Sequence, residues 1–183
     1  MNAKTVLIPV AHGSESLETV AIANVLRRGG LQVTLASIET DLTVDGTLDI
    51  RLTADRFLGD VLSASYDLIV VPGGSKGSEA LSACAALIER LRQQRAASQW
   101  YGAICAAPAV VLSPHGLLEG RRATCYPAFR DRLAQYVDEA VVVDGNCVTS
   151  AGPGTAVAFA LKLVELLCGH DKAQQVAAAA LVR

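Results

Sequence analysis

The chain has 183 residues, a formal net charge of −2 with histidine neutral, 51% hydrophobic residues and 19% charged residues. This length predicts one domain covering residues 1–183, and the composition supplies the apolar side chains of a sizeable core, which excludes a disordered chain. A near-neutral chain also lacks the basic excess typical of nucleic-acid binding or a basic membrane patch, so neither partner is expected.

The cysteine pattern and the amino-terminal sequence indicate the cellular compartment in which the protein works. Zinc sites and secreted disulfide frameworks use paired or clustered cysteines, whereas the spacing here is wide, so a reducing compartment is expected. Pro9, His12 and Glu15 interrupt the first apolar run too early for a signal peptide. The longest apolar stretches reach about half of the roughly 20 residues of a membrane span. We therefore expect a cytoplasmic protein without a bound metal or cofactor. The five cysteines stand at 84, 105, 125, 147 and 168.

Short apolar runs alternate with longer segments of helical periodicity, which is typical of an α/β fold with crossover helices and a mostly parallel sheet. Ser14 or Ser16 is expected to cap the first helix, and Asp171 the last. Strands are predicted at 5–11, 31–38, 66–71, 100–104 and 122–125, with hairpins at 42–52 around Asp45-Gly46 and at 140–150 around Asp144-Gly145. Helices are predicted at 15–28, 78–99, 106–112, 127–136, 154–168 and 171–181.

Cys105 is the strongest candidate for chemistry, because it stands between a buried strand and a helix start. Ligands gather at the carboxyl ends of strands in an open parallel sheet, and a residue on such a bend turns its side chain outward. Its neighbours Gly102, Ala103, Ala106 and Ala107 are small enough for the bend. The amides and dipole of the helix start are expected to lower the pKa of the thiol. The alternative is a buried structural thiol.

Two other features lie near the ends of predicted strands. Gly73-Gly74 allows close approach of the backbone to a ligand and aims an amide at negative charge, with the Ala106 amide as a second donor; alternatively it is simply a turn. Glu18 lies in the first turn of its helix, where its ordinary role is an interaction with the helix dipole. If it points toward Cys105 instead, burial favours the protonated acid, which donates a hydrogen bond to sulfur.

Four motifs occur in the order and spacing of a known protein family. Over nearly its whole length the chain resembles the ThiJ/PfpI superfamily, in particular the branch of the parkinsonism-associated deglycase and its bacterial YajL-like relatives. The resemblance implies a flavodoxin-like sandwich with helices on both faces of a mostly parallel sheet, in a homodimer. The motifs are GSESLETV at 13–20, VVPGGSKG at 70–77, AICAAPAVV at 103–111 and TSAGPGTA at 149–156.

The resemblance also implies roles for single residues. Cys105 is the reactive, oxidation-sensitive thiol, Glu18 is the protonated acid beside it, and the amides of Gly74 and Ala106 form the oxyanion pocket. The implied activities are glutathione-independent conversion of methylglyoxal to lactate, deglycation of early glyoxal adducts on proteins or nucleotides, and protection against oxidative stress. Chaperone activity is attributed to such relatives too.

Two positions depart from the family pattern. Ala106 stands where protease-like members carry a histidine, which argues against a Cys-His peptidase. Tyr126 stands where the parkinsonism-associated branch places a histidine near the thiol, so the obvious imidazole base is missing. His12 is placed where it could substitute, although a loop histidine is more often solvent-facing. Cys125 is either a second thiol near the pocket or a packed strand cysteine.

Two functions from different classes remain, and the same thiol serves both. In the first, Cys105 adds to the aldehyde of methylglyoxal or of a glycation adduct, and turnover is slow because no base is evident. In the second, the protein is a redox sensor or redox-regulated chaperone that works by Cys105 oxidation to sulfinate. A third possibility, a non-functional interaction module, predicts an unreactive Cys105.

Overall fold

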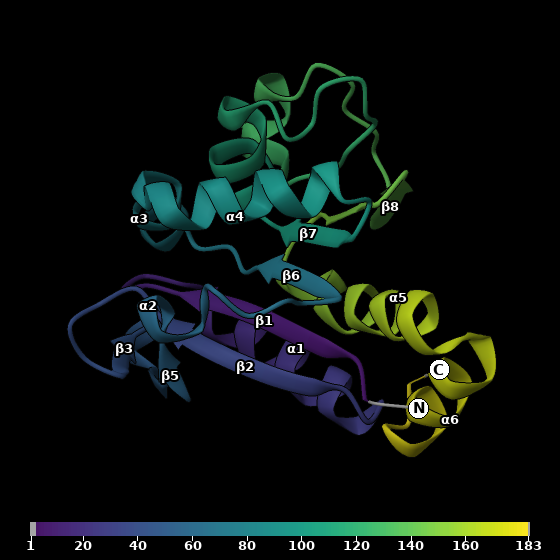
Figure 1. Ribbon diagram of the computed structural model, residues 1–183. Helices are drawn as coiled ribbons and strands as arrows, with labels where there is room; N and C mark the ends of the chain where they lie inside the picture. The colour runs from purple at the N-terminus through teal and green to yellow at the C-terminus, as the bar shows by residue number, and fades with distance from the viewer. Residues whose placement is uncertain (1–2, 183) are drawn as a thin grey trace.

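A seven-stranded sheet forms the middle layer of the computed structural model, which describes residues 3–182 (Figure 1). The strand order is β5-β2-β1-β6-β7-β9-β8, and all neighbours are parallel except β8 and β9. This arrangement confirms the predicted α/β class with a mostly parallel sheet. The strands are β1 (Thr5–Val10), β2 (Gln32–Ser37), β5 (Arg56–Phe57), β6 (Leu68–Val71), β7 (Trp100–Ile104), β8 (Val141–Asp144) and β9 (Cys147–Ser150).

Helices cover both faces of this sheet, which completes the three-layer sandwich. Figure 1 shows α3 and α4 over one side, while the cores place α1 and α5 on the other. Successive residues of β1 serve the two cores, because side chains alternate along a strand: Ile8 packs with Ile22 of α1, and Leu7 with Leu91 of α4. The helices are α1 (Ser16–Arg28), α2 (Leu58–Val61), α3 (Ser75–Ala83), α4 (Ala85–Ala96), α5 (Ala156–Cys168) and α6 (His170–Ala179). No helix within residues 3–182 is long and apolar enough to cross a membrane.

Both predicted hairpins form. The first pairs β3 (Thr43–Asp45) with β4 (Arg51–Thr53), but residues 46–50 make a longer connection than the tight turn predicted at Asp45-Gly46. This connection is hydrogen-bonded to the start of α1. The Thr47 amide donates to the Ser14 carbonyl at 3.0 Å, and the Ser16 hydroxyl donates to the Thr47 carbonyl at 3.2 Å. These contacts outweigh the local preference of the dipeptide.

Two predicted elements are wrong because tertiary contacts override local pattern. The helix predicted at 78–99 is two helices, α3 and α4, since Cys84 is extended (ψ 91°). The strand predicted at 122–125 is absent, and only a single bridge joins Ala123 to Tyr136. There the Thr124 amide donates to the Thr149 hydroxyl at 2.9 Å instead of a neighbouring strand.

Smaller corrections concern helix ends and short helices. Glu15, not Ser14 or Ser16, caps α1, because its side chain accepts from the Glu18 amide. Gly169 precedes α6, and Asp171 lies inside its first turn rather than capping it. The helices predicted at 106–112 and 127–136 are short, a π-helical stretch at Pro108–Leu112 and a 3-10 helix at Pro127–Arg132.

Candidate active site

Cys105 sits on a strained turn directly after β7. Its φ of 64° lies in the left-handed region, which residues other than glycine rarely adopt and which costs about 1–3 kcal/mol. Hydrogen bonds hold the main chain on both sides of the Cys105 α-carbon. The Cys105 amide donates to the Ser150 carbonyl at 3.0 Å, and the Tyr126 amide donates to the Cys105 carbonyl at 2.8 Å. Such a turn persists only where its surroundings impose it, so the position of the sulfur is set by the end of β9 and the segment around Tyr126.

Glu18 reaches the same place from the first turn of α1. Its side chain is fully buried, and Oε2 accepts a hydrogen bond from the Gly73 amide at 2.8 Å. The second carboxyl oxygen, Oε1, is buried and has no hydrogen-bond partner within residues 3–182. A buried carboxyl with one oxygen unpaired is costly as an anion, which marks Glu18 as a group that prefers its proton.

Gly73 lies between the two side chains. A Cβ atom added to Gly73 would stand 2.5 Å from the Cys105 Cβ and 2.6 Å from Glu18 Oε2. Both side chains therefore pack against the same α-carbon, and any residue larger than glycine would push them apart. The structure thus brings together Cys105 and Glu18, which lie on separate elements of the chain.

Gly74 completes the site by a close approach of two loops. Its φ of 86° and the overlap that a Cβ would make with the Gly13 carbonyl oxygen both require glycine. The loops are joined where the Glu15 amide donates to the Gly73 carbonyl at 2.9 Å. The amides of Gly74 and Ala106 lie near the sulfur of Cys105 and act to lower the pKa of its thiol.

The electrostatics of the pair correct one expectation from the sequence. Burial raises the pKa of Glu18 to about 7, and the Glu15 carboxylate acts in the same direction, whereas the Gly73 amide and Cys105 lower it. Burial and the Glu18 carboxylate raise the pKa of Cys105 to about 12, against the amides of Gly74 and Ala106. The predicted lowering of the thiol pKa is wrong, because only a five-residue helical stretch follows the turn and the sulfur is enclosed beside a carboxylate.

The carboxyl and the thiol cannot both be charged at low cost, so they share one negative charge and titrate as a pair. A thiolate at Cys105 requires the proton to sit on Glu18. The neutral acid then becomes a hydrogen-bond donor beside the sulfur, as its unpaired oxygen permits.

His12 is not brought to this pair. It is an exposed residue, its Nδ1 accepts from the Asp45 amide at 3.0 Å, and its amide donates to Glu39 Oε1 at 2.9 Å. Within residues 3–182 these contacts tie His12 to the side of the β3–β4 hairpin. The geometry gives no support to His12 as a substitute base.

Tyr126 and Cys125 are adjacent to the turn in different ways. Tyr126 is bonded to Cys105 through its main chain, is 45% exposed, and has its ring beside Gly152. Cys125 is fully buried, its thiol donates to the Tyr126 carbonyl at 3.4 Å, and burial raises its pKa to about 11. These features favour a packed structural cysteine over a second reactive thiol.

Comparison with known proteins identifies the family. A model of the DJ-1/PfpI family matches residues 4–166. The chain belongs to this family. Protein DJ-1 homolog A of Arabidopsis thaliana is 47% identical over 98% of this chain, which spans about half of that relative (47%). Glutathione-independent glyoxalase DJR-1.2 of Caenorhabditis elegans is 38% identical over 91% of this chain and 89% of that protein.

Solved structures agree with this assignment. The structure of oxidized Toxoplasma gondii DJ-1 has a TM-score of 0.96 and 41% identity, and the match covers 98% of both chains. The resemblance read from the four motifs and the DJ-1 type of flavodoxin-like fold are therefore confirmed for this DJ-1/PfpI protein.

Sequence reasoning missed one residue that builds the site. Glu15 positions Glu18 directly, because its Oε2 accepts from the Glu18 amide at 2.6 Å while its Oε1 accepts from the Thr47 hydroxyl at 3.1 Å. The sequence carries little signal for this, since serine, threonine, aspartate and asparagine are the preferred capping residues and Ser14 and Ser16 flank it. Within residues 3–182, no group of three or more His, Cys, Asp or Glu side chains is placed to bind a metal ion.

The raised pKa of Glu18 predicts a pH dependence of stability. A carboxyl whose pKa is raised from 4.5 to about 7 on folding favours the fold fully below pH 4.5, and this contribution is lost as pH rises through about 7. The loss at high pH amounts to about 3 kcal/mol. Glu18→Gln has no such group, so the difference between its free energy of unfolding and that of wild type should change by this amount.

Urea unfolding of both proteins between pH 4.5 and about pH 8 measures this difference. Glu79→Gln, on the exposed side of α3, is the matched control and should follow wild type. Parallel curves for Glu18→Gln and wild type would contradict a raised pKa at Glu18.

Proposed function

We propose that this DJ-1/PfpI protein protects against reactive aldehydes, with Cys105 adding to methylglyoxal or to an early glycation adduct and Glu18 managing the protons. One observation carries the proposal: a thiol on a strained turn is packed with a buried acid against Gly73 and faced by two main-chain amides. The name of the C. elegans relative, a glutathione-independent glyoxalase, supports the substrate class.

The reaction requires the proton on Glu18 and the charge on Cys105, which is the minor arrangement of the pair because the thiol has the higher pKa (about 12, against about 7 for Glu18). The sulfur forms a bond to the aldehyde carbon, and the carbonyl electron pair moves to oxygen, which the amides of Gly74 and Ala106 stabilise. Glu18 donates its proton to that oxygen, giving a hemithioacetal and a Glu18 carboxylate.

The same carboxylate then serves as the base for the rearrangement of the methylglyoxal adduct. It takes the proton from the carbon bonded to sulfur, and a proton returns to the neighbouring carbonyl carbon through an enediol, giving a lactate thioester. One water molecule hydrolyses the thioester, which releases lactate and restores the thiol. For a glycation adduct, the sulfur first forms its bond to the carbon that carries the amine, the bond from that carbon to nitrogen breaks, and the Glu18 proton goes to the departing amine.

Turnover should be slow, because a separate positioned base typically contributes about 10²–10⁴-fold and Tyr126 supplies no imidazole. Ala106, which follows Cys105 where protease-like relatives carry a histidine, also argues against peptidase activity, since the nucleophile of such enzymes is activated by an adjacent base.

Methylglyoxal loss and lactate formation without glutathione test the enzyme directly, using metal-free preparations cleared of contaminating enzymes. Cys105→Ser should abolish lactate formation, and Glu18→Ala should lower the rate by about 10²-fold or more because it removes the proton carrier. Cys168→Ser changes an exposed thiol remote from Gly73 and serves as the control. Equal rates in wild type and Cys105→Ser would end the proposal.

A second candidate function is redox sensing, or redox-regulated chaperone action, through the same thiol. The observation that favours it is the buried Oε1 of Glu18, which has no hydrogen-bond partner within residues 3–182 and would, when protonated, donate to an oxygen carried by the sulfur. Each of two peroxide molecules would transfer one oxygen atom to Cys105 and leave as water, giving a sulfinate. A relative from Toxoplasma gondii has a structure in an oxidized form.

Mass spectrometry after mild peroxide treatment tests the sensor. Cys105 should be oxidised before the other four cysteines, and Glu18→Ala should remove that preference because the sulfinate loses its donor. Oxidation of the exposed Cys168 or the half-buried Cys84 ahead of Cys105 would refute this function.

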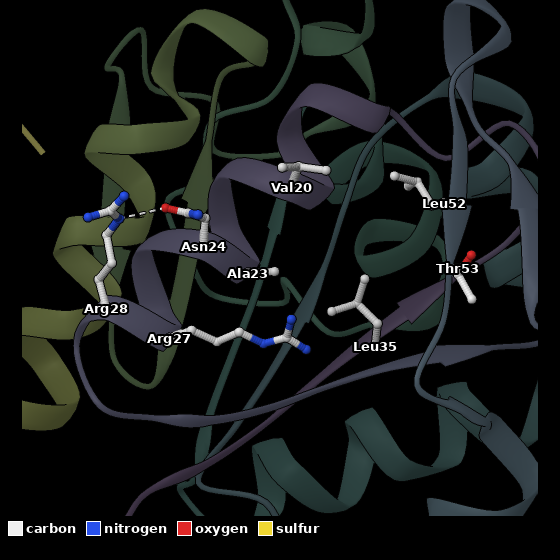
Figure 2. A pocket seen from close by; sticks show the side chains of 8 residues that line it. All are labelled: Val20, Ala23, Asn24, Arg27, Arg28, Leu35, Leu52 and Thr53. Carbon is white, nitrogen blue, oxygen red and sulfur yellow. Dashed lines mark hydrogen bonds between the residues drawn. The ribbon is translucent and has the colours of Figure 1, made fainter.

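We also propose that the protein acts as a homodimer, as the family resemblance implies. The outer face of α1 exposes Leu17 by 54% and Val20 by 50%, and apolar surface of this kind marks an interface. Figure 2 shows the groove of about 520 Å³ beside it, where Val20 of α1 faces Leu52 of β4. A second groove of about 420 Å³ joins the same face to Val157 and Val182. A second copy would cover this face, the helix and both grooves together.

Sedimentation velocity tests the dimer. Wild type should sediment as a dimer, and Leu17→Glu should shift it to monomer at the same concentration because it buries a charge in an apolar interface. Phe57→Ser alters an exposed apolar residue on the edge strand β5, outside both grooves, and should leave the dimer intact. A monomeric wild type, or a dimeric Leu17→Glu, would contradict the proposal.

A further inference from the structure

A separate groove of about 470 Å³ lies on the side of the protein away from Cys105. It is bounded by the last turns of α4 and by the segment 115–121, and Tyr101 fixes it to the beginning of β7 by donating to the Leu117 carbonyl at 2.7 Å. Cys105 follows the other end of the same strand, about 13 Å further along. The groove therefore belongs to a different part of the surface from the thiol.

Two half-buried arginines in its wall form no ion pair within residues 3–182. Arg95 donates to the carbonyls of Gly116 and Glu119, and Arg121 donates to the Asp144 carbonyl and the Asn146 side chain. Carbonyl and amide groups are dipoles, and the ion pairs within residues 3–182 involve neither arginine. In addition, Nε of Arg121 is buried without a hydrogen-bond partner in that range.

One further lining residue, Arg92, adds positive charge. Arg92, one turn before Arg95, exposes 54% of its side chain and lies 3.9 Å from Glu89, a weak surface pair. His115 also lines the groove, with Nε2 3.0 Å from the Ser82 hydroxyl. Glu119 is the one carboxylate among the lining residues, against three guanidinium groups. The groove therefore carries more positive than negative groups, and two of its three guanidinium groups are held in place by hydrogen bonds.

We propose that this groove binds a small molecule that carries a phosphoryl group. Guanidinium groups present planar pairs of donors that match phosphate oxygens, and such charge-assisted hydrogen bonds are stronger than neutral ones. The volume falls within the roughly 300–1,000 Å³ of small-molecule sites. Arg92 offers its planar pair of donors to the phosphoryl group, while Arg95 and Arg121, whose terminal nitrogens already donate to the protein, add their charges. Ala96 and Leu117 contact the remainder of the ligand.

Titration of the 183-residue chain with inorganic pyrophosphate, followed by amide NMR shifts, tests the site. Wild type should show saturable shifts at residues 92–96 and 115–121. Arg92→Gln should weaken binding about tenfold, because an exposed guanidinium is lost without disturbing the carbonyls that Arg95 and Arg121 hold. Arg90→Gln is the matched control on the same helix, since its side chain donates to the Ala64 carbonyl and lies outside the groove.

Citrate at equal ionic strength distinguishes phosphoryl recognition from attraction of any polyanion. Pyrophosphate should bind at least tenfold more tightly than citrate, and Arg92→Lys, which keeps the charge but removes the planar pair of donors, should reduce that difference in affinity. The proposal is overturned by the absence of saturable shifts, by equal affinity in wild type and Arg92→Gln, or by citrate binding as tightly as pyrophosphate.

Discussion

The hydrogen bond from the Gly73 amide to the buried carboxyl of Glu18 connects the start of the first helix to the end of β6, and the geometry of the site depends on it. Because Gly73 has no side chain, Glu18 and Cys105 pack on the same α-carbon. Because Gly74 has a positive φ and no Cβ, the loop at 13–15 fits against the loop after β6. Without this contact Glu18 would not lie beside Cys105, and the strained cysteine would be an ordinary buried thiol.

Burial of that acid gives the site its chemistry. When the buried carboxyl of Glu18 is ionised, its charge holds the Cys105 thiol in its protonated form by repulsion, so a thiolate forms only when the proton sits on Glu18. Because Glu18 is enclosed and one of its oxygens is unpaired, its carboxyl takes up and releases a proton near neutral pH. While Glu18 holds that proton, the single negative charge of the pair lies on the sulfur or, after addition, on the oxygen of the substrate. Aldehyde addition and oxidation to sulfinate both create a new oxygen beside the sulfur, and the same proton serves each.

Several of these features could be predicted from sequence, because they depend on local pattern. The continuous apolar run at 66–71 and the strand at 100–104 lie where the periodicity placed them, and the small residues around Cys105 predicted its bend. The break at Cys84 and the missing strand at 122–125 depend on contacts with distant segments, which periodicity does not contain. The direction of the Cys105 pKa failed for the same reason, since it is set by enclosure and by Glu18 rather than by the following helix.

The titration of the Glu18 carboxyl itself tests the central claim most directly. NMR of protein labelled at the glutamate side-chain carboxyl carbon, with the Glu18 signal assigned from Glu18→Gln, follows its proton as pH changes. The structure predicts a pKa of about 7 for Glu18 in wild type. A Glu18 carboxyl that titrates at the ordinary value of 4.5 would contradict the account, because the site would then hold no acid to pair with the thiolate of Cys105.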